Sequence, residues 1–291
     1  MLFHHHGYVS TNPRVQVAAG IGLDRPAELP DEMDVLIVGS GPAGMIAAAQ
    51  LAMFPDVHTR IIERRPHRLE IGQADGIQAR SVETFQAFGF ASEIIDEAFD
   101  LTSMAFWNPA EDDADTIVRT SLAEDDPEGV SEFPHLIVNQ ARILDWFAEY
   151  MKNSPTRARP DYGWAFETLE DTNDGEHPVL VTLRRTVDAE GNALEDPASG
   201  PTRQVRAKYV VGADGAGSRV RKAIGHTLTG DAANHAWGVM DALADTDFPD
   251  IRTKCAIHSS SGSILLIPRE GGHLFRMYVC LLYTSPSPRD L

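Results

Sequence analysis

Three glycines at the spacing Gly39-x-Gly41-x-x-Gly44 are the clearest chemical signal in the sequence. They follow an apolar, β-branched run at residues 34–38 and precede an alanine-rich stretch at residues 45–54. This order predicts a buried strand, a tight turn and a helix whose free N–H groups face the phosphates of a dinucleotide. Gly39 would permit the sharp turn, Gly41 would let the backbone approach the pyrophosphate, and Gly44 would let helix and strand pack closely.

An acidic residue at the end of the next predicted strand supports the same interpretation. This strand covers residues 59–63, so Glu63 stands at its end and Arg64 follows it. A carboxylate there accepts hydrogen bonds from ribose hydroxyls and repels a 2′-phosphate, which favours FAD or NAD over NADP as the bound dinucleotide. We assign Glu63, Arg64 and the loop residues Pro42 and Ala43 to the cofactor site together with the three glycines. The alternative is an ordinary glycine-rich turn.

A second glycine-flanked turn lies far downstream, at the end of a predicted strand. Asp214 stands between Ala213 and Gly215, and Ser218 is suited to cap the helix that follows. Alone, an Asp-Gly turn after a strand is usually only a turn. Together with the first motif, however, it resembles the class A flavoprotein monooxygenases, the aromatic hydroxylases. The resemblance implies bound FAD, with Asp214 near its pyrophosphate and ribose and also helping to bind the nicotinamide.

Further segments resemble one branch of that family, the phenol 2-monooxygenases and 3-hydroxybenzoate 4-monooxygenases. Residues 72–80 (GQADGIQAR) are similar to a branch segment whose aspartate, here Asp75, faces the substrate hydroxyl. We assign Gln73 of this segment to the cofactor site. Residues 139–142 match a segment whose glutamine, here Gln140, contacts FAD.

A predicted strand pair completes the resemblance. Residues 267–270 and 276–278 are similar to strands around the flavin ring. The resemblance implies that Tyr278 hydrogen-bonds the phenolic oxygen and that Arg269 organises flavin and substrate. NADPH or NADH would reduce the flavin, and O₂ would add at its C4a to form the hydroperoxide that attacks the ring.

The proposed catalytic residues also have structural interpretations. We assign Asp75 as the base that deprotonates the substrate hydroxyl and Tyr278 as the group that orients the same oxygen. Asp75 between Ala74 and Gly76 is otherwise suited to an Asx turn, and Tyr278 to a core position with a satisfied hydroxyl. Arg269 is equally suited to an ion pair with Glu270 or another acid.

The elements that would position these residues belong to a mixed α/β fold. We expect a Rossmann-like FAD-binding domain with a βαβ unit, interleaved with a β-sheet substrate domain. The predicted helices cover 45–54, 80–88 and 142–147, and the later predicted strands 179–183, 206–211, 263–267 and 274–279. The acidic segment 93–132 is expected to be solvated and rich in loops. The predicted parts are an N-terminal arm at 1–32, the FAD-binding domain at 33–100 and 136–225, the substrate sheet at 101–135 and 226–280, and a tail at 281–291.

Composition limits the other function classes. The chain has 291 residues and a formal charge of −18, which argues against nucleic acid or an anionic membrane as the main partner. Two cysteines allow neither a disulfide framework nor a cysteine zinc site, and the histidines lack metal-ligand spacing, so no metal is expected. No secretory signal or long apolar segment is visible, so we expect a cytoplasmic protein. The expected partners are a small aromatic substrate, O₂ and NAD(P)H, with a homodimer in the full-length form.

Three departures from the family pattern lead to an expectation about the end of the chain. The family's later Gly-Asp motif is not found, because Gly230-Asp231 lacks the preceding strand, and the thioredoxin-like C-terminal domain of the branch is absent too. Residues 281–291 are similar to translated sequencing-adapter sequence. We therefore expect an incomplete front part of a longer enzyme that binds FAD weakly. The alternatives are a non-hydroxylating FAD-dependent oxidoreductase of the halogenase or reductase type, an NAD-dependent dehydrogenase, and a nucleotide-binding module without catalysis.

Overall fold

The computed structural model describes residues 2–4, 7–9, 26, 28–70, 72, 74–230 and 236–281. Gln73, most of the predicted N-terminal arm, Asp231 and the predicted tail beyond residue 281 therefore lie outside the described residues. The chain divides into two compact units, formed by residues 1–72 with 140–229 and by residues 73–139 with 230–291. The boundary at 72/73 differs from the predicted domain boundary at residue 100, and the assignment of FAD-binding and substrate domains stays a prediction.

The first unit is built on a six-stranded sheet whose core strand is β3 (Glu32–Val38). The strand order is β10 (Pro160–Tyr162), β4 (Thr59–Glu63), β3, β13 (Thr202–Gly212), β12 (Val179–Arg185) and β11 (Trp164–Asp171). The first four strands pair in parallel with one another, and the β13–β12 and β12–β11 pairings are antiparallel. Leu36, Ile37 and Val38 are all buried, as expected for a parallel strand covered on both faces.

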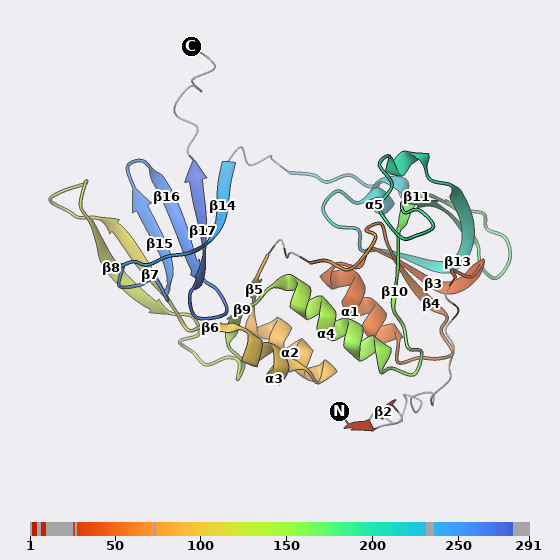
Figure 1. Cartoon of the computed structure of the whole chain (residues 1–291), viewed down its shortest axis with the longest axis horizontal. Helices are drawn as coiled ribbons and strands as arrows, with labels where there is room; N and C mark the ends of the chain where they lie inside the picture. The colour runs from red at the N-terminus through yellow and green to blue at the C-terminus, as the bar shows by residue number, and fades with distance from the viewer. Residues whose placement is uncertain are drawn as a thin grey trace, which may run out of the picture. The chain divides into compact units, whose positions relative to one another are not determined.

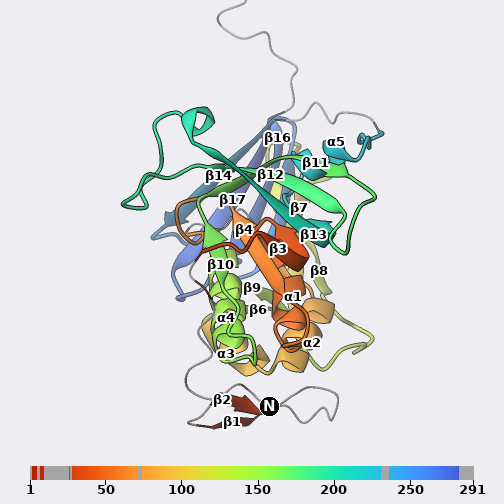
Figure 2. The same cartoon turned by 90° about the vertical axis from the view of Figure 1, so that its right-hand side faces the viewer.

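Three α-helices and one 3₁₀ helix accompany this sheet among the described residues. Helix α1 (Pro42–Leu51) connects β3 to β4 and packs against both strands and against α4 (Gln140–Lys152), which lies beside it in Figure 2. Helix α5 (Arg219–Ala223) follows β13, and a 3₁₀ helix η1 (Pro197–Ser199) lies between β12 and β13. The predicted βαβ unit is therefore confirmed. Two short strands, β1 (Leu2–His4) and β2 (Gly7–Val9), form a separate hairpin near the N-terminus.

The second unit contains a mostly antiparallel sheet of six strands (Figure 1). Its order is β14 (Ala236–Leu243), β17 (Leu274–Leu281), β16 (Gly262–Pro268), β15 (Lys254–Ser259), β7 (Ser103–Pro109) and β8 (Ile117–Glu124). A small sheet of β5 (Gly76–Ile77), β9 (His135–Ile137) and β6 (Phe99–Leu101) accompanies helices α2 (Ala79–Phe88) and α3 (Ala91–Glu97). Ala105, Cys255, Leu266 and Phe275 form the buried core of the larger sheet.

Most predicted elements are confirmed, among them the helix over 80–88, whereas the loop-rich segment expected at 93–132 is wrong. The helix predicted over 80–88 ends at Gly89, which adopts a left-handed φ of +84°. The segment 93–132 is solvated but not rich in loops, since it contains most of α3 and all of β6, β7 and β8. Strand β8 is an edge strand exposed on both faces, so its sequence lacks the alternation that identifies a strand.

The first helix also ends earlier than predicted. It stops at Leu51, whereas the sequence placed its end at residue 54, just before Pro55. The carbonyl oxygen of Ala52 instead accepts hydrogen bonds from the backbone N–H of Thr156 at 3.2 Å and from its hydroxyl at 3.0 Å. A tertiary contact therefore replaces the last helical hydrogen bonds.

Membrane-spanning helices and metal clusters were sought in the parts of the chain with described coordinates. No helix there has both the length and the apolar character needed to cross a bilayer. Within the same residues, no group of three or more histidine, cysteine or acidic side chains is placed to hold a metal ion.

Candidate functional site

The glycine loop lies at the carboxyl end of β3, between its parallel neighbours β4 and β13. Gly39 has a φ of +104°, and a Cβ there would lie 2.5 Å from the carbonyl oxygen of Ala213. A Cβ on Gly44 would overlap the carbonyl oxygen of Gly39. A Cβ on Gly41, by contrast, would meet nothing within 4 Å. Gly39 and Gly44 are therefore required by the fold, whereas Gly41 faces open space of the kind a pyrophosphate needs.

The two sequence motifs meet at this edge of the sheet. Ala213 donates its N–H to the carbonyl oxygen of Val38 at 2.8 Å, so the Asp214 turn lies directly beside the glycine loop. The Asp214 carboxylate accepts hydrogen bonds from the Ser218 hydroxyl at 2.5 Å and from the Arg219 N–H at 2.6 Å. Ser218 in turn caps α5, as predicted. In this structure Asp214 orders its own turn, and its contact with FAD stays a prediction.

Glu63 also contacts the glycine loop. It is buried, and its Oε2 accepts hydrogen bonds from the Ser40 N–H at 3.0 Å and from the Ser40 hydroxyl at 2.9 Å. Its Oε1 accepts the N–H of Arg65 at 3.0 Å. The carboxylate is thus held beside the loop, at the end of β4 where an acid is expected to meet a ribose.

The remaining cofactor candidates in the first unit occupy more open positions. Pro42 and Ala43 form the exposed first turn of α1, and Gln140 is the half-buried first residue of α4. Arg64 is exposed, and its carbonyl oxygen accepts the Thr186 hydroxyl at 2.6 Å. The first unit therefore contains all the described cofactor candidates, from the glycine loop to Asp214.

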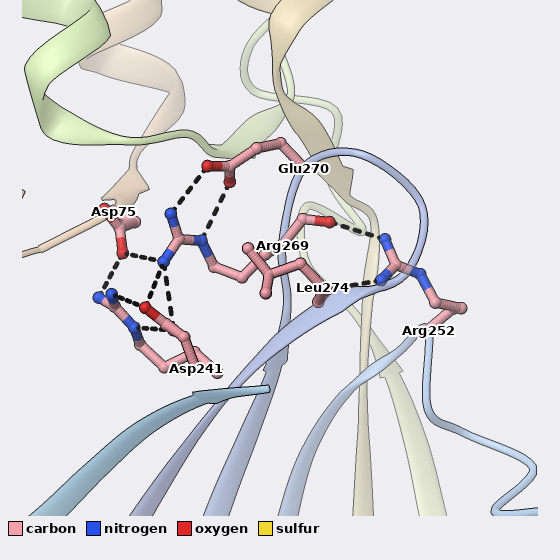
Figure 3. A network of polar contacts seen from close by, with 7 residues as sticks. Asp75, Asp241, Arg252, Arg269, Glu270 and Leu274 are labelled. Atoms are coloured by element: carbon pink, nitrogen blue, oxygen red, sulfur yellow. Dashed lines mark hydrogen bonds and ion pairs between the residues drawn. The ribbon is translucent and has the colours of Figure 1, made fainter. Parts of the chain in front are cut away.

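Asp75 is buried among cations of the second unit, with an exposed fraction of 5%. Its carbonyl oxygen accepts the N–H of Val138 at 2.9 Å, which places the residue at the start of β5. Its Oδ2 forms ion pairs with Nη1 of Arg269, at 2.9 Å, and with Nη1 of Arg276 (Figure 3). Both arginines are also buried, with 4% and 7% of their residue surface exposed. Asp75 is therefore a paired carboxylate.

Arg269 forms an ion pair with Glu270, which is one of the two roles predicted for this arginine from the sequence. Its Nε and Nη2 donate to the two Glu270 carboxylate oxygens at 3.0 and 2.8 Å. Its Nη1 also approaches Asp241 on β14, at 3.2 Å. Its predicted role toward flavin and substrate is separate from these contacts and stays a prediction.

Asp241 is the residue of this cluster that sequence reasoning missed. It lies opposite Arg276 in the β14–β17 register, and the two side chains form a bidentate pair with both distances at 2.7 Å. Arg276 therefore lowers the pKa of Asp241, and Asp241 raises that of Arg276. A single acid within the apolar segment AWGVMDAL was the available signal.

Tyr278 lies two residues after Arg276 on β17, so both side chains are on the same face of the strand. A hydrogen bond with the Tyr278 hydroxyl helps to raise the pKa of Arg276. Asp75 and Tyr278, the predicted base and the predicted orienting group, thus share Arg276 as a neighbour. The second unit therefore brings all three predicted catalytic residues together.

Arg252 holds the turn that carries Arg269. Its Nη1 donates to the carbonyl oxygen of Leu274 and its Nη2 to that of Arg269, both at 2.8 Å (Figure 3). Its guanidinium also lies over the Phe99 ring, 4.8 Å from the ring centroid. One side chain therefore connects the two ends of the β16–β17 turn to β6.

We expect the change Arg252→Met to lower the free energy of unfolding by about 2–3 kcal/mol, because it removes two charge-assisted donors but keeps most of the stem. Urea unfolding measures the effect. Arg203→Met is the matched control, since Arg203 pairs with the exposed Asp31 and such a pair contributes at most about 1 kcal/mol. Equal effects of the two changes would contradict the role assigned to Arg252.

Comparison with protein families and relatives gives one consistent result. The family model described as "FAD binding domain" matches residues 32–289. The chain is 47% identical over 280 residues to a 3-hydroxybenzoate 4-monooxygenase of Comamonas testosteroni, covering 96% of the chain and 43% of the relative. It is 39% identical over 255 residues to the FAD-dependent monooxygenase terD of Aspergillus terreus, covering 85% of the chain and 39% of the relative. The chain thus spans less than half the length of these relatives.

Solved structures share the fold. The p-nitrophenol 4-monooxygenase PnpA from Pseudomonas putida matches with a TM-score of 0.70 at 17% identity, over 90% of this chain and 60% of that protein. The flavin-dependent monooxygenase PieE, solved in complex with FAD and substrate, matches with a TM-score of 0.69 at 20% identity, over 89% and 45%. At these identities the likeness establishes the architecture.

Proposed function

Because this chain belongs to the FAD binding domain family, we propose that the protein carrying it is an FAD-dependent monooxygenase that hydroxylates a phenolic or hydroxybenzoate ring with NAD(P)H and O₂. The observation that carries this proposal is the 47% identity, over 96% of the chain, to a 3-hydroxybenzoate 4-monooxygenase. The buried Asp75 supports it from the structure, since hydroxylation of a phenol benefits from a carboxylate that accepts the hydroxyl proton.

The first unit would hold the cofactor. The open space at Gly41 fits the approach of a pyrophosphate, and the N-terminal N–H groups of α1 would bind its oxygens. Glu63 and Asp214 would accept hydrogen bonds from the ribose side, with Arg64 and Gln140 as further contacts. Bound FAD would supply the activation of O₂ that side chains cannot provide.

The second unit would supply the acid–base chemistry. Asp75 would accept the proton of the substrate hydroxyl, which raises the electron density of the ring. Tyr278 would hold the same oxygen in position. Arg269 and Arg276 hold the Asp75 carboxylate in place through their ion pairs. Arg269 would also help to organise flavin and substrate.

The proposal is tested on a full-length enzyme that contains this sequence. We expect a flavin absorbance spectrum and NAD(P)H oxidation that phenol or 3-hydroxybenzoate accelerates, with a hydroxylated product formed in equal amount. NADH and NADPH are compared in parallel. Oxidation that the aromatic compound does not accelerate would support a non-hydroxylating oxidoreductase instead, and a colourless protein would exclude both.

A further inference from the structure

The cluster around Asp75 contains more carboxylates than guanidiniums. Its members are Asp75, Asp241, Arg269, Glu270 and Arg276, which we call the Asp75 cluster. Three carboxylates against two guanidiniums give it one net negative charge. Among its members, Asp75 and the two arginines are buried, whereas Asp241 has a side-chain exposure of 38%. Part of the net negative charge of the cluster is therefore on Asp241, which is in contact with solvent.

Two arginines on one buried carboxylate create a problem for a base. A cation within about 4–6 Å lowers a carboxyl pKa by roughly 1–3 units, and Asp75 has two such neighbours. A general base works best when its pKa lies near the operating pH. With these two arginines alone, Asp75 would be well ordered but weakly basic.

Asp241 binds the same two arginines from the other side. It forms the bidentate pair with Arg276, at 2.7 Å for each bond, and accepts Nη1 of Arg269 at 3.2 and 3.3 Å. Nη1 of Arg269 is thus shared between Asp75 and Asp241 (Figure 3). The positive charge that faces Asp75 is partly neutralised from β14.

We propose that Asp241 is a positioning residue for Asp75. Asp241 aligns Arg269 and Arg276, and its negative charge offsets part of their positive charge. The Asp75 carboxylate thereby keeps a proton affinity high enough for a base. The effect of Asp241 on the proton affinity of Asp75 concerns this chain alone, whereas the effect on catalysis rests on the proposed function. Glu270 offsets the positive charge of Arg269 in the same way, but it has no ion pair with Arg276 among the described contacts.

The other titratable groups near Asp75 are present in both wild type and Asp241→Asn. His135 on β9 has its Nε2 3.6 Å from the position of a Cβ on Gly76, and its Nδ1 lies 3.3 Å from Asp125. Tyr278 shares β17 with Arg276. Arg252 donates to two carbonyl oxygens at the base of the β16–β17 turn. A change in the Asp75 titration on altering Asp241 is therefore attributable to the shared arginines and the lost charge.

The test is an NMR titration of this chain labelled with ¹³C at the aspartate carboxyl carbons, with the Asp75 resonance assigned by the variant Asp75→Asn. We expect Asp241→Asn to move the Asp75 titration midpoint downward by about 1 pH unit or more, because both arginines then face Asp75 alone. Asp113→Asn is the matched control, since Asp113 is exposed and bonds only within its own turn. An unchanged or raised midpoint in Asp241→Asn overturns the proposal.

A second variant keeps the test valid if Asp241→Asn does not fold. Glu270→Gln removes one partner of Arg269 and leaves the Asp241–Arg276 pair intact. A smaller downward shift supports the proposal, and no shift overturns it.

In a full-length enzyme, the acid limb of the kcat profile is expected to move downward with the NMR midpoint in Asp241→Asn. The turnover number at the plateau is expected to fall with the weaker base. An NMR shift without a change in the kcat profile would support the role of Asp241 and would overturn that of Asp75 as the base. The two proposals are therefore separable.

Discussion

Gly44→Ala is expected to abolish FAD binding and to lower the free energy of unfolding by about 3 kcal/mol, because the added Cβ overlaps the carbonyl oxygen of Gly39. Helix α1 would have to move away from β3, since the overlapping atom belongs to the backbone and cannot rotate aside. The same movement would displace the N-terminal N–H groups that are expected to bind phosphate. Urea unfolding and fluorescence titration with FAD, both on the full-length enzyme, measure the two effects.

Gly41→Ala is the matched control three residues away, and its expected result is different. A Cβ at Gly41 meets nothing within 4 Å, and its backbone, at φ −72° and ψ −179°, suits alanine. We therefore expect a stability change below about 1 kcal/mol but FAD binding at least about tenfold weaker, a loss of about 1.4 kcal/mol. Equal FAD affinity in Gly41→Ala and wild type would contradict placement of the pyrophosphate at this loop.

Asp75→Asn is expected to slow hydroxylation by about 10²–10⁴-fold, the contribution of a positioned base. FAD binding is expected to persist, because the described cofactor candidates lie in the other compact unit. Removing one charge from a buried pair also costs stability, so the variant is compared with wild type well below its unfolding temperature. Single-turnover kinetics with bound FAD measure the rate.

Asp113→Asn again serves as the control for the loss of one carboxylate from the second unit, and its rate is expected to equal that of wild type. An Asp75→Asn rate within about threefold of wild type would show that Asp75 is not the base, since a base contributes at least about 10²-fold.

Local patterns explain why the nucleotide-binding core was predictable. The apolar run of β3, the glycine spacing and the acid at the end of β4 each reflect a requirement of one short segment. Ser218 likewise caps α5 from within its own turn. Such features depend on neighbours in sequence, so they are visible without the fold.

The contacts within the Asp75 cluster were less predictable because they depend on strand register. Asp241 meets Arg276 through the β14–β17 pairing, and Asp75 reaches both arginines from the position just before β5. No local pattern in the sequence states which strands pair. The resemblance nevertheless predicted Asp75, Arg269 and Tyr278 as a group, whereas the partner that joins them from β14 required the structure.

The bounds of two elements were the other source of error. Strand β8 has polar residues on both faces, so it looks like a loop in sequence. Helix α1 ends where Thr156 binds Ala52, a contact between residues far apart in the chain. The existence of β8 and the end of α1 both depend on contacts with distant segments rather than on the periodicity of their own sequence.

The most direct test of the proposed activity is incorporation of oxygen from ¹⁸O₂. A full-length enzyme containing this sequence is supplied with FAD, NAD(P)H, ¹⁸O₂ and 3-hydroxybenzoate or phenol, and the aromatic product is examined by mass spectrometry. We expect one ¹⁸O atom in the hydroxylated ring for each NAD(P)H oxidised. NAD(P)H oxidation that yields hydrogen peroxide with no labelled aromatic product would contradict the assignment as an aromatic monooxygenase.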